Sequence, residues 1–108
     1  SFGYIPDCVS MSIMLKNATG KEPFFIGKPE PIMVDCVLKK YKKEPAEAVI
    51  IGDRLYTDIK TGIRAGIDTI CVLSGEASKE DIRESEIEPD YIFRSVQEIY
   101  EGLAEENR

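Results

Sequence analysis

The sequence predicts an α/β fold in which a partial parallel sheet lies between helices, giving three layers. Two mostly apolar runs, residues 46–51 and 69–73, each stop at a polar corner that contains glycine, as buried parallel strands do. A helical pattern over residues 57–65 separates the two runs. Because a crossover of this kind makes successive strands parallel, both corners are expected at one edge of the sheet.

The other elements follow from periodicity and from turn residues. Asp7 is a candidate N-cap for a helix of about three turns that stops near residues 17–20. The Phe-Phe-Ile run at residues 24–26 predicts a short buried strand, and residues 30–43 carry a wide apolar stripe on one helix. The strand at 46–51 is expected to be buried on both faces. Three elements complete the order: a helix capped by Ser78, an edge strand at 91–93, and a last helix opened by a capping box at Ser95 and Glu98.

Length and charge restrict the classes of function. The 108 residues, 43% hydrophobic and 31% charged, are typical of one folded domain. Twenty acids against 14 Lys and Arg give a net charge of −6, which disfavours nucleic acid and anionic membranes as partners. The basic cluster at residues 39–43 ends a helical pattern and is expected to complement the helix dipole; a binding patch is the alternative. No membrane span and no signal peptide are expected.

The cysteines predict a reducing environment. Cys8, Cys36 and Cys71 are odd in number, widely spaced and set in apolar surroundings, so we expect reduced core residues in a cytoplasmic protein. Cys36 is not expected to be a nucleophile, because the chain has no His to activate it. The chain begins Ser-Phe-Gly-Tyr without an initiating Met, so we expect it to be a fragment.

Two acids mark the corner after the first long strand. Gly52-Asp53 ends the strand, and Asp58 follows in the first turn of the next helix. Ligands of open α/β sheets bind beyond the carboxyl ends of the strands, where Asp53 is expected to lie. Two carboxylates without His or paired Cys suit Mg²⁺ better than a softer metal. The alternative is structural, because Asp after a strand is also a common helix cap.

Lys28 is the second candidate site residue. It follows the apolar run at 24–26 and lies between Gly27 and Pro29, so a backbone corner holds it. A lysine at such a corner can reach the edge that Asp53 occupies and neutralise a phosphate or a carboxylate. The alternative is a solvated lysine in a turn.

Taken in order, these motifs resemble the C-terminal half of a haloacid dehalogenase (HAD)-superfamily phosphatase of the NagD / p-nitrophenyl-phosphatase branch. The resemblance covers roughly Phe24 to Leu103 and implies a Rossmann-like core. It rests on Gly27-Lys28-Pro29, the run from Gly52 to Ile59, Gly62-Ile63-Arg64-Ala65-Gly66 and Val72-Leu73-Ser74-Gly75. It also implies two parts: residues 1–22, the tail of a cap domain and a linker, and residues 23–108, the C-terminal part of the core.

The resemblance implies roles for three residues. Lys28 matches the lysine that steadies the phosphoryl group and the charge of the nucleophile. Asp53 matches the acid that binds Mg²⁺ directly or through water, and Asp58 matches the second acid of the same loop. These roles fit phosphoryl transfer, which depends on positioning and neutralising charged oxygens.

The sequence departs from the family in lacking the nucleophile. These phosphatases attack with the first Asp of an Asp-x-Asp pair, and no such pair occurs in this sequence. The threonine or serine loop and most of the cap are also absent, so we expect this chain alone to be inactive. In the family the strand ending at Asp53 lies beside the nucleophile strand, so its edge is expected to be open. The expected partner is the missing N-terminal half, or a second copy through that edge.

Three functional hypotheses remain. The first is the C-terminal portion of a Mg²⁺-dependent phosphatase that hydrolyses small phosphorylated metabolites through an aspartyl-phosphate. The second is a stand-alone, non-catalytic binding or assembly module derived from the same fold. The third is a receiver-like phosphoacceptor domain, which is disfavoured because Lys28 precedes the acids.

Overall fold

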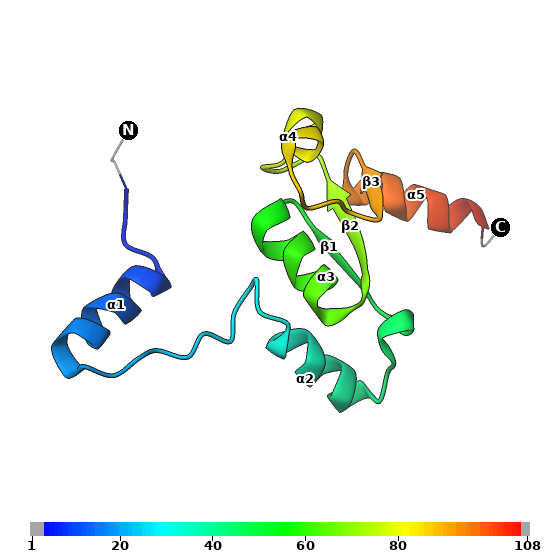
Figure 1. Cartoon of the computed structure of the whole chain (residues 1–108). Coiled ribbons are helices and arrows are strands. Elements are labelled where there is room, and N and C mark those ends of the chain that lie inside the picture. The colour runs from blue at the N-terminus through cyan, green and yellow to red at the C-terminus, as the bar shows by residue number, and fades with distance from the viewer. Residues whose placement is uncertain (1–3, 107–108) are drawn as a thin grey trace.

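The computed structural model describes residues 4–106 and confirms the α/β fold (Figure 1). The described chain contains three strands in one parallel sheet, in the order β1-β2-β3. In chain order the elements are α1 (Cys8–Thr19), α2 (Ile32–Tyr41), the 3₁₀ turn η1 (Pro45–Glu47), β1 (Val49–Gly52), the π-helical turn η2 (Leu55–Ile59), α3 (Lys60–Ala65), β2 (Asp68–Val72), α4 (Lys79–Glu84), β3 (Tyr91–Phe93) and α5 (Val96–Glu106).

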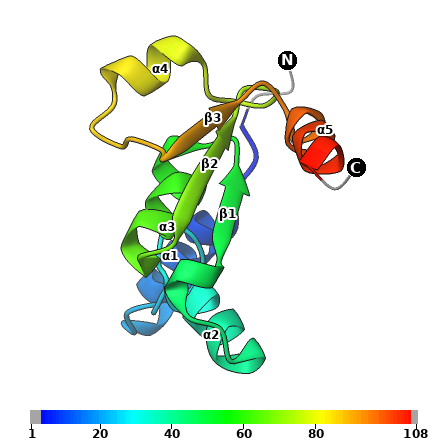
Figure 2. The ribbon, with the colours of Figure 1, turned by 90° about the vertical axis from the view of Figure 1, so that its right-hand side faces the viewer.

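Helices lie on both faces of the sheet, as Figure 2 shows for α3 and α5. Gly62 brings α3 close to one face, because a Cβ at this position would overlap the methyl groups of Thr69 and Ile50. The opposite face of β2 carries Ile70, which lines a groove together with Ile99 of α5. Successive residues of a strand point to opposite faces, so β2 contacts both helical layers. The three-layer arrangement is therefore the predicted one.

The core is small and lies between η2 and β2. Leu55, Ile59, Cys71 and Ala77 form the buried cluster, and Ile59 and Cys71 are 0% exposed. The N-terminal end of β2 is fixed by a polar contact: Asp90 Oδ2 accepts hydrogen bonds from the backbone N–H and the hydroxyl of Thr69, at 2.8 and 2.6 Å. The N-terminal end of β2 is thus anchored beside a small core by a buried polar contact whose groups are hydrogen-bonded.

The N-terminal helix forms as predicted but stands away from the sheet. Asp7 Oδ1 accepts the N–H of Ser10 at 3.0 Å, and Gly20 ends α1 with φ 70°. Figure 1 shows an extended segment joining α1 to the rest of the molecule. No residue of α1 is buried.

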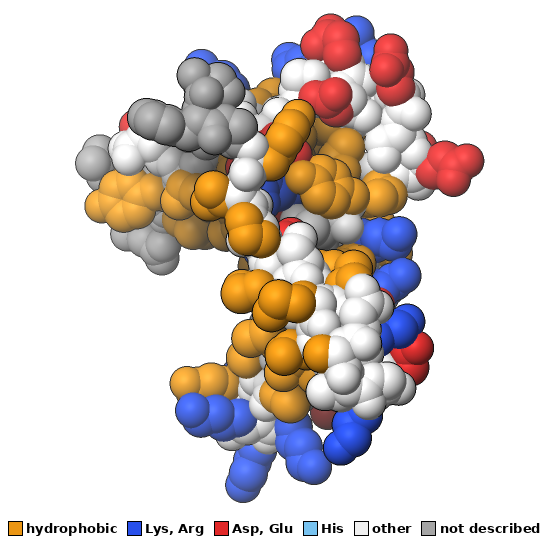
Figure 3. Space-filling view, turned by 90° about the vertical axis from the view of Figure 1, so that its left-hand side faces the viewer, with side chains coloured by type: hydrophobic (Ala, Val, Ile, Leu, Met, Phe, Trp, Pro, Cys, Tyr) orange, Lys and Arg blue, Asp and Glu red, His pale blue; other side chains and the backbone are white. Residues whose placement is uncertain are grey.

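The predicted buried strand at residues 24–26 was wrong. These residues are extended but belong to no strand, and Phe24 is 80% exposed. Strands are stabilised by pairing, and the described chain provides no neighbouring strand for this segment. Figure 3 shows hydrophobic side chains exposed on this side of the molecule. Lys and Arg gather at the end formed by α1 and α2, and Asp and Glu gather near α4.

Two predictions for the first long strand need correction. Residues 45–47 form η1, so the strand begins only at Val49. Burial on both faces was wrong, because Val49 is 48% exposed and Ile51 is 41% exposed. Helix α5 packs against β3 and beside β2 and leaves this face of β1 uncovered. As expected, β1 lies at an edge of the sheet that residues 4–106 form.

The helical elements differ from the predictions mainly in their bounds. The helix expected at 57–65 begins earlier, as the π-helical turn η2, and continues as α3. Ser78 caps α4 as predicted, through its hydroxyl and the N–H of Asp81. Helix α5 begins directly after Ser95, but Glu98 accepts its backbone hydrogen bond from Arg94 N–H at 2.6 Å. Lys39 and Lys40 lie in the last turn of α2, where cations complement the helix dipole.

The predicted core position holds for one cysteine of the three. Cys71 is buried, whereas Cys8 and Cys36 are exposed, and all three are free thiols. Cys8 lies on the unpacked helix α1 and Cys36 on the outward side of α2, so an apolar neighbourhood in sequence did not imply burial. Within residues 4–106, no helix is both long and apolar enough to cross a membrane.

Candidate functional site

The candidate site lies at the carboxyl edge of the sheet, where the arrowheads of β1 and β2 point the same way in Figure 2. Asp53 follows the last residue of β1, and the loop after β2 returns past it. A hydrogen bond joins the two loops, because Ala77 N–H donates to the carbonyl oxygen of Asp53 at 2.9 Å. The predicted convergence of both corners on one edge is therefore confirmed.

Lys28 reaches this edge and contacts Asp58 directly. Its Nζ lies 2.5 Å from Asp58 Oδ1, although the two residues are 30 positions apart. The Asp58 side chain is only 10% exposed, whereas that of Lys28 is 54% exposed. A carboxylate so poorly hydrated needs a positive partner and hydrogen bonds. Its second oxygen accepts the N–H of Arg54 at 3.2 Å, so both oxygens are occupied.

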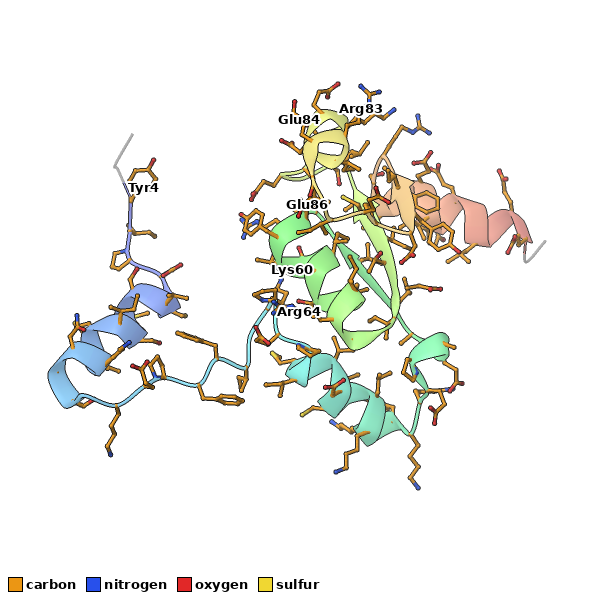
Figure 4. The ribbon with its side chains drawn as sticks, viewed as in Figure 1. Tyr4, Lys60, Arg64, Arg83, Glu84 and Glu86 are labelled. Atoms are coloured by element: carbon orange, nitrogen blue, oxygen red, sulfur yellow. The ribbon has the colours of Figure 1, made fainter. Side chains whose placement is uncertain are left out.

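The lysine corner is tied to α3. Glu30 N–H donates to the Gly27 carbonyl at 3.0 Å, which closes a turn around Lys28. Arg64 of α3 reaches the same corner, with Nη1 2.6 Å from Glu30 Oε1 and 3.5 Å from the Pro29 carbonyl oxygen. In Figure 4, Arg64 lies beside the corner of the chain that leads into α2. The Lys28 backbone is therefore held from two sides.

Two glycines make room for the two acids. A Cβ on Gly52 would overlap the side chain of Asp58, and a Cβ on Gly75 would overlap that of Asp53. Asp58 thus packs directly against the main chain at the end of β1, and Asp53 packs against the main chain of the loop after β2. Glycine is required at both positions because of this close approach, not because of an unusual φ angle.

Asp53 lies at the same edge but does not contact Lys28. Its Oδ2 accepts the N–H of Glu76 at 2.9 Å, and Oδ1 accepts no hydrogen bond from residues 4–106. Both acids lie near the buried thiol of Cys71: burial raises the pKa of Cys71 most, and the charges of Asp53 and Asp58 raise this pKa further. The structure therefore brings Lys28 and Asp58 together and places Asp53 in the neighbouring loop.

Sequence reasoning missed a polar network beside Asp53. Glu76 Oε1 accepts the hydroxyl of Tyr56 at 2.7 Å, and Glu76 Oε2 lies 2.6 Å from Arg54 Nε. Glu76 raises the pKa of Arg54 through its charge, and it raises the pKa of Tyr56 mainly by accepting the hydrogen bond of the phenol. No local pattern predicts this network, because Tyr56 and Glu76 are 20 residues apart.

The donor chemistry of the site fits a hard cation in part. Asp53 and Asp58 offer carboxylate oxygens, which are the ligands that Mg²⁺ prefers. Only Asp53 Oδ1 has no partner among the described residues, since Lys28 and Arg54 occupy Asp58. The described part of the chain has no group of three or more His, Cys, Asp or Glu arranged to hold a metal. The residues therefore supply the right atoms but not a full octahedral set.

Comparison with known proteins identifies the same fold and family. The HAD-hydrolase-like family model matches residues 25–99. Ribonucleotide monophosphatase NagD of Escherichia coli K12 is 40% identical over 97 residues, which are 90% of this chain and 39% of that protein. The NagD structure matches with a TM-score of 0.80 and 39% identity, covering 91% of this chain and 39% of NagD.

Two further solved structures show the same relationship. A 4-nitrophenylphosphatase from Thermotoga maritima matches with a TM-score of 0.79 and 38% identity, over 90% of this chain and 38% of its own. A glycerol phosphate phosphatase from Mycobacterium tuberculosis in complex with calcium matches with a TM-score of 0.72 and 33% identity, over 86% of this chain and 27% of its own. The chain thus spans about two fifths of the NagD length. From the match over residues 25–99, together with these structures, the chain belongs to the HAD-hydrolase-like family.

Proposed function

We propose that this chain is the C-terminal part of the core of a Mg²⁺-dependent phosphatase that hydrolyses small phosphorylated metabolites. The observation that supports it best is the Lys28–Asp58 pair at the sheet edge, with Asp53 in the adjoining loop. The similar proteins are phosphatases, which agrees with a site built from one cation and two carboxylates.

Each site residue takes one task in this proposal. Lys28 binds the phosphoryl oxygens, and its half-exposed side chain can turn from Asp58 toward an incoming phosphate. Asp53 and Asp58 hold the Mg²⁺, with Asp53 Oδ1 as the oxygen that is free to coordinate. A bound Mg²⁺ supplies neutralisation of the charge on the transferring group. The calcium complex of the mycobacterial relative supports a divalent cation in this family.

The nucleophile comes, in this proposal, from a segment outside the sequence. The 108 residues contain no Asp-x-Asp pair, and the chain matches only 39% of NagD. An Asp from that segment would form the aspartyl-phosphate, so this chain alone is inactive. Residues 1–22 then belong to the tail of a cap domain and its linker, and residues 23–108 to the core.

The open edge of β1 is the surface proposed for the partner. Among residues 4–106 no strand pairs with this edge of β1, Val49 and Ile51 are exposed on one face of the same strand, and an unpaired strand edge favours association. The segment with the nucleophile is the proposed occupant, and a second copy takes its place when this chain is studied alone. Light scattering at increasing concentration tests this, since a monomer at high concentration would contradict it. We also propose a cytoplasmic location, because exposed free thiols such as Cys8 and Cys36 persist in reducing compartments.

The decisive experiment uses the complete protein that contains this chain. We expect Mg²⁺-dependent hydrolysis of small phosphate monoesters, lost on chelation of the metal. Lys28→Met and Asp53→Asn should each lower kcat about a hundredfold or more, since each removes charge stabilisation from the transition state. Glu47→Gln, which changes an exposed ion pair distant from the site, is the matched control. If the complete protein hydrolyses no monoester, the non-catalytic binding module becomes the better description.

A further inference from the structure

We propose that Glu76 is a positioning residue for Asp53. Its backbone N–H holds the Asp53 carboxylate, and its side chain ties down the loop that follows Asp53. The consequence for metal binding rests on the proposed function, in which Asp53 holds Mg²⁺. The tethering of the two loops does not depend on that function.

Glu76 contacts three residues of one loop through two kinds of group. Its N–H donates to Asp53 Oδ2 at 2.9 Å. Its carboxylate reaches back over the loop, where Oε1 accepts the Tyr56 hydroxyl at 2.7 Å and Oε2 meets Arg54 Nε at 2.6 Å. The main chain of Glu76 therefore contacts the first residue of the segment 53–56, and its side chain contacts the last residue and Arg54.

The contacts between the two loops fix the direction of the Asp53 carboxylate. The main chain of the loop after β2 borders Asp53 on one side. The Asp53 side chain lies so close to Gly75 that a Cβ on this glycine would overlap it. Ala77 N–H holds the carbonyl oxygen of Asp53 at 2.9 Å. With Oδ2 fixed by Glu76, Oδ1 is the oxygen left for a ligand. If the loop after β2 shifts, the Asp53 side chain shifts with it.

The exposure of the Arg54–Glu76 pair indicates whether Glu76 stabilises the whole fold or positions Asp53. The side chains of Arg54 and Glu76 are 52% and 45% exposed, and exposed ion pairs contribute little to global stability. Loss of the Glu76 side chain should therefore loosen one loop without unfolding the chain. Residues that orient a metal ligand typically change metal affinity by about 10–100-fold when they are mutated. The network is thus better suited to set the position of Asp53 than to hold the fold together.

An ordinary surface ion pair is the competing explanation, and the chain offers a matched control. Lys43 and Glu47 lie 2.6 Å apart with side chains 54% and 47% exposed, and Glu47 also accepts a backbone N–H, from Glu44 at 3.0 Å. This pair resembles the Glu76 network in exposure and geometry, but its residues are absent from both loops of the site. Glu47→Ala therefore measures the effect of losing a similar exposed ion pair that lies outside the site.

Amide hydrogen exchange on this chain tests the tether directly. In Glu76→Ala the Ala77 N–H should exchange about fivefold faster, because two side-chain contacts that close the loop are lost. The amide of Cys71, inside β2, should stay unchanged, as should Ala77 in Glu47→Ala. The double variant Arg54→Gln/Tyr56→Phe removes the same contacts while keeping residues 75–77 and should reproduce the effect. An unchanged Ala77 rate in both variants, or equal acceleration at Cys71, would overturn the proposal.

The Mg²⁺ dependence of the complete protein tests the consequence for the site. In Glu76→Ala the Mg²⁺ concentration for half-maximal activity should rise about tenfold, while kcat at saturating Mg²⁺ changes much less. Glu76→Gln retains an acceptor for Tyr56 and should restore part of the affinity. A Mg²⁺ requirement unchanged in Glu76→Ala would overturn the link to the metal. A complete protein without phosphatase activity would refute the proposed function instead, and hydrogen exchange would still decide the tether.

Discussion

Lys28 and Asp58 form an ion pair of 2.5 Å across 30 residues of sequence, and the carboxylate in this pair is nearly buried. The pair joins the corner before α2 to the π-helical turn after β1. It is therefore both a candidate element of the active site and a contact that closes the fold. This double role leads to the first prediction.

Lys28→Met should destabilise the chain by about 1–3 kcal/mol, because it leaves a poorly hydrated carboxylate without its charged partner. Urea unfolding at neutral pH measures the change. Lys43→Met breaks an exposed pair and should cost at most about 1 kcal/mol. An equal loss of the free energy of unfolding in the two variants would show that the burial of Asp58 does not increase the contribution of its ion pair to stability. Adding Asp58→Asn to Lys28→Met should recover part of the loss.

Gly52→Ala should destabilise the chain by about 1–3 kcal/mol, because the added methyl group overlaps the Asp58 side chain. Thermal unfolding followed by circular dichroism measures it. Gly102→Ala is the control with the opposite sign, because a methyl group on Gly102 would meet nothing in residues 4–106 beyond the backbone of its own helix, α5. Alanine there should stabilise the helix by about 0.5–1 kcal/mol. If both variants change stability in the same direction, the close packing on Gly52 is incorrect.

Thr69→Val should raise the pKa of Asp90 toward its ordinary value of 3.8, because hydrogen bonds from the side chain and backbone of Thr69 hold this pKa down. A carboxylate whose pKa is lowered by folding adds stability above its unfolded pKa. That stability is lost as the pH falls from about 4 through the folded pKa. Carbon-13 NMR titration of the Asp90 carboxyl measures the shift. Thr69→Ser keeps the hydroxyl and should keep the pKa low; the same pKa in both variants would contradict the assignment.

The thiols should fall into two kinetic classes with a disulfide reagent such as Ellman's reagent. Cys8 and Cys36 are exposed and should react quickly, whereas Cys71 should react only on unfolding. Burial and the nearby carboxylates raise the pKa of Cys71, so its reactive thiolate is scarce in the folded state. Mass spectrometry of the modified peptides separates the three sites. Rapid modification of Cys71 in the folded chain would place it outside the core.

Residues 24–26 and Glu76 show where sequence reasoning stopped. The Phe-Phe-Ile run predicts a strand, but hydrophobic pattern does not reveal whether another strand lies beside it, and here none does within residues 4–106. Glu76 follows a turn and carries no recognisable motif, yet it contacts three residues at least 20 positions away. Its role arises only when two loops meet in space.

The pattern of residues along the chain was enough to predict the α/β class, the parallel order of β1 and β2, and the edge at which Asp53 lies. These features follow from local information: apolar runs, caps, glycine corners and the handedness of the crossover. Three features became visible only in the folded chain: Lys28 pairs with Asp58, Gly52 and Gly75 accommodate the acids, and Val49 and Ile51 are exposed. Contacts between distant segments depend on how elements pack, and no local pattern of residues encodes that packing.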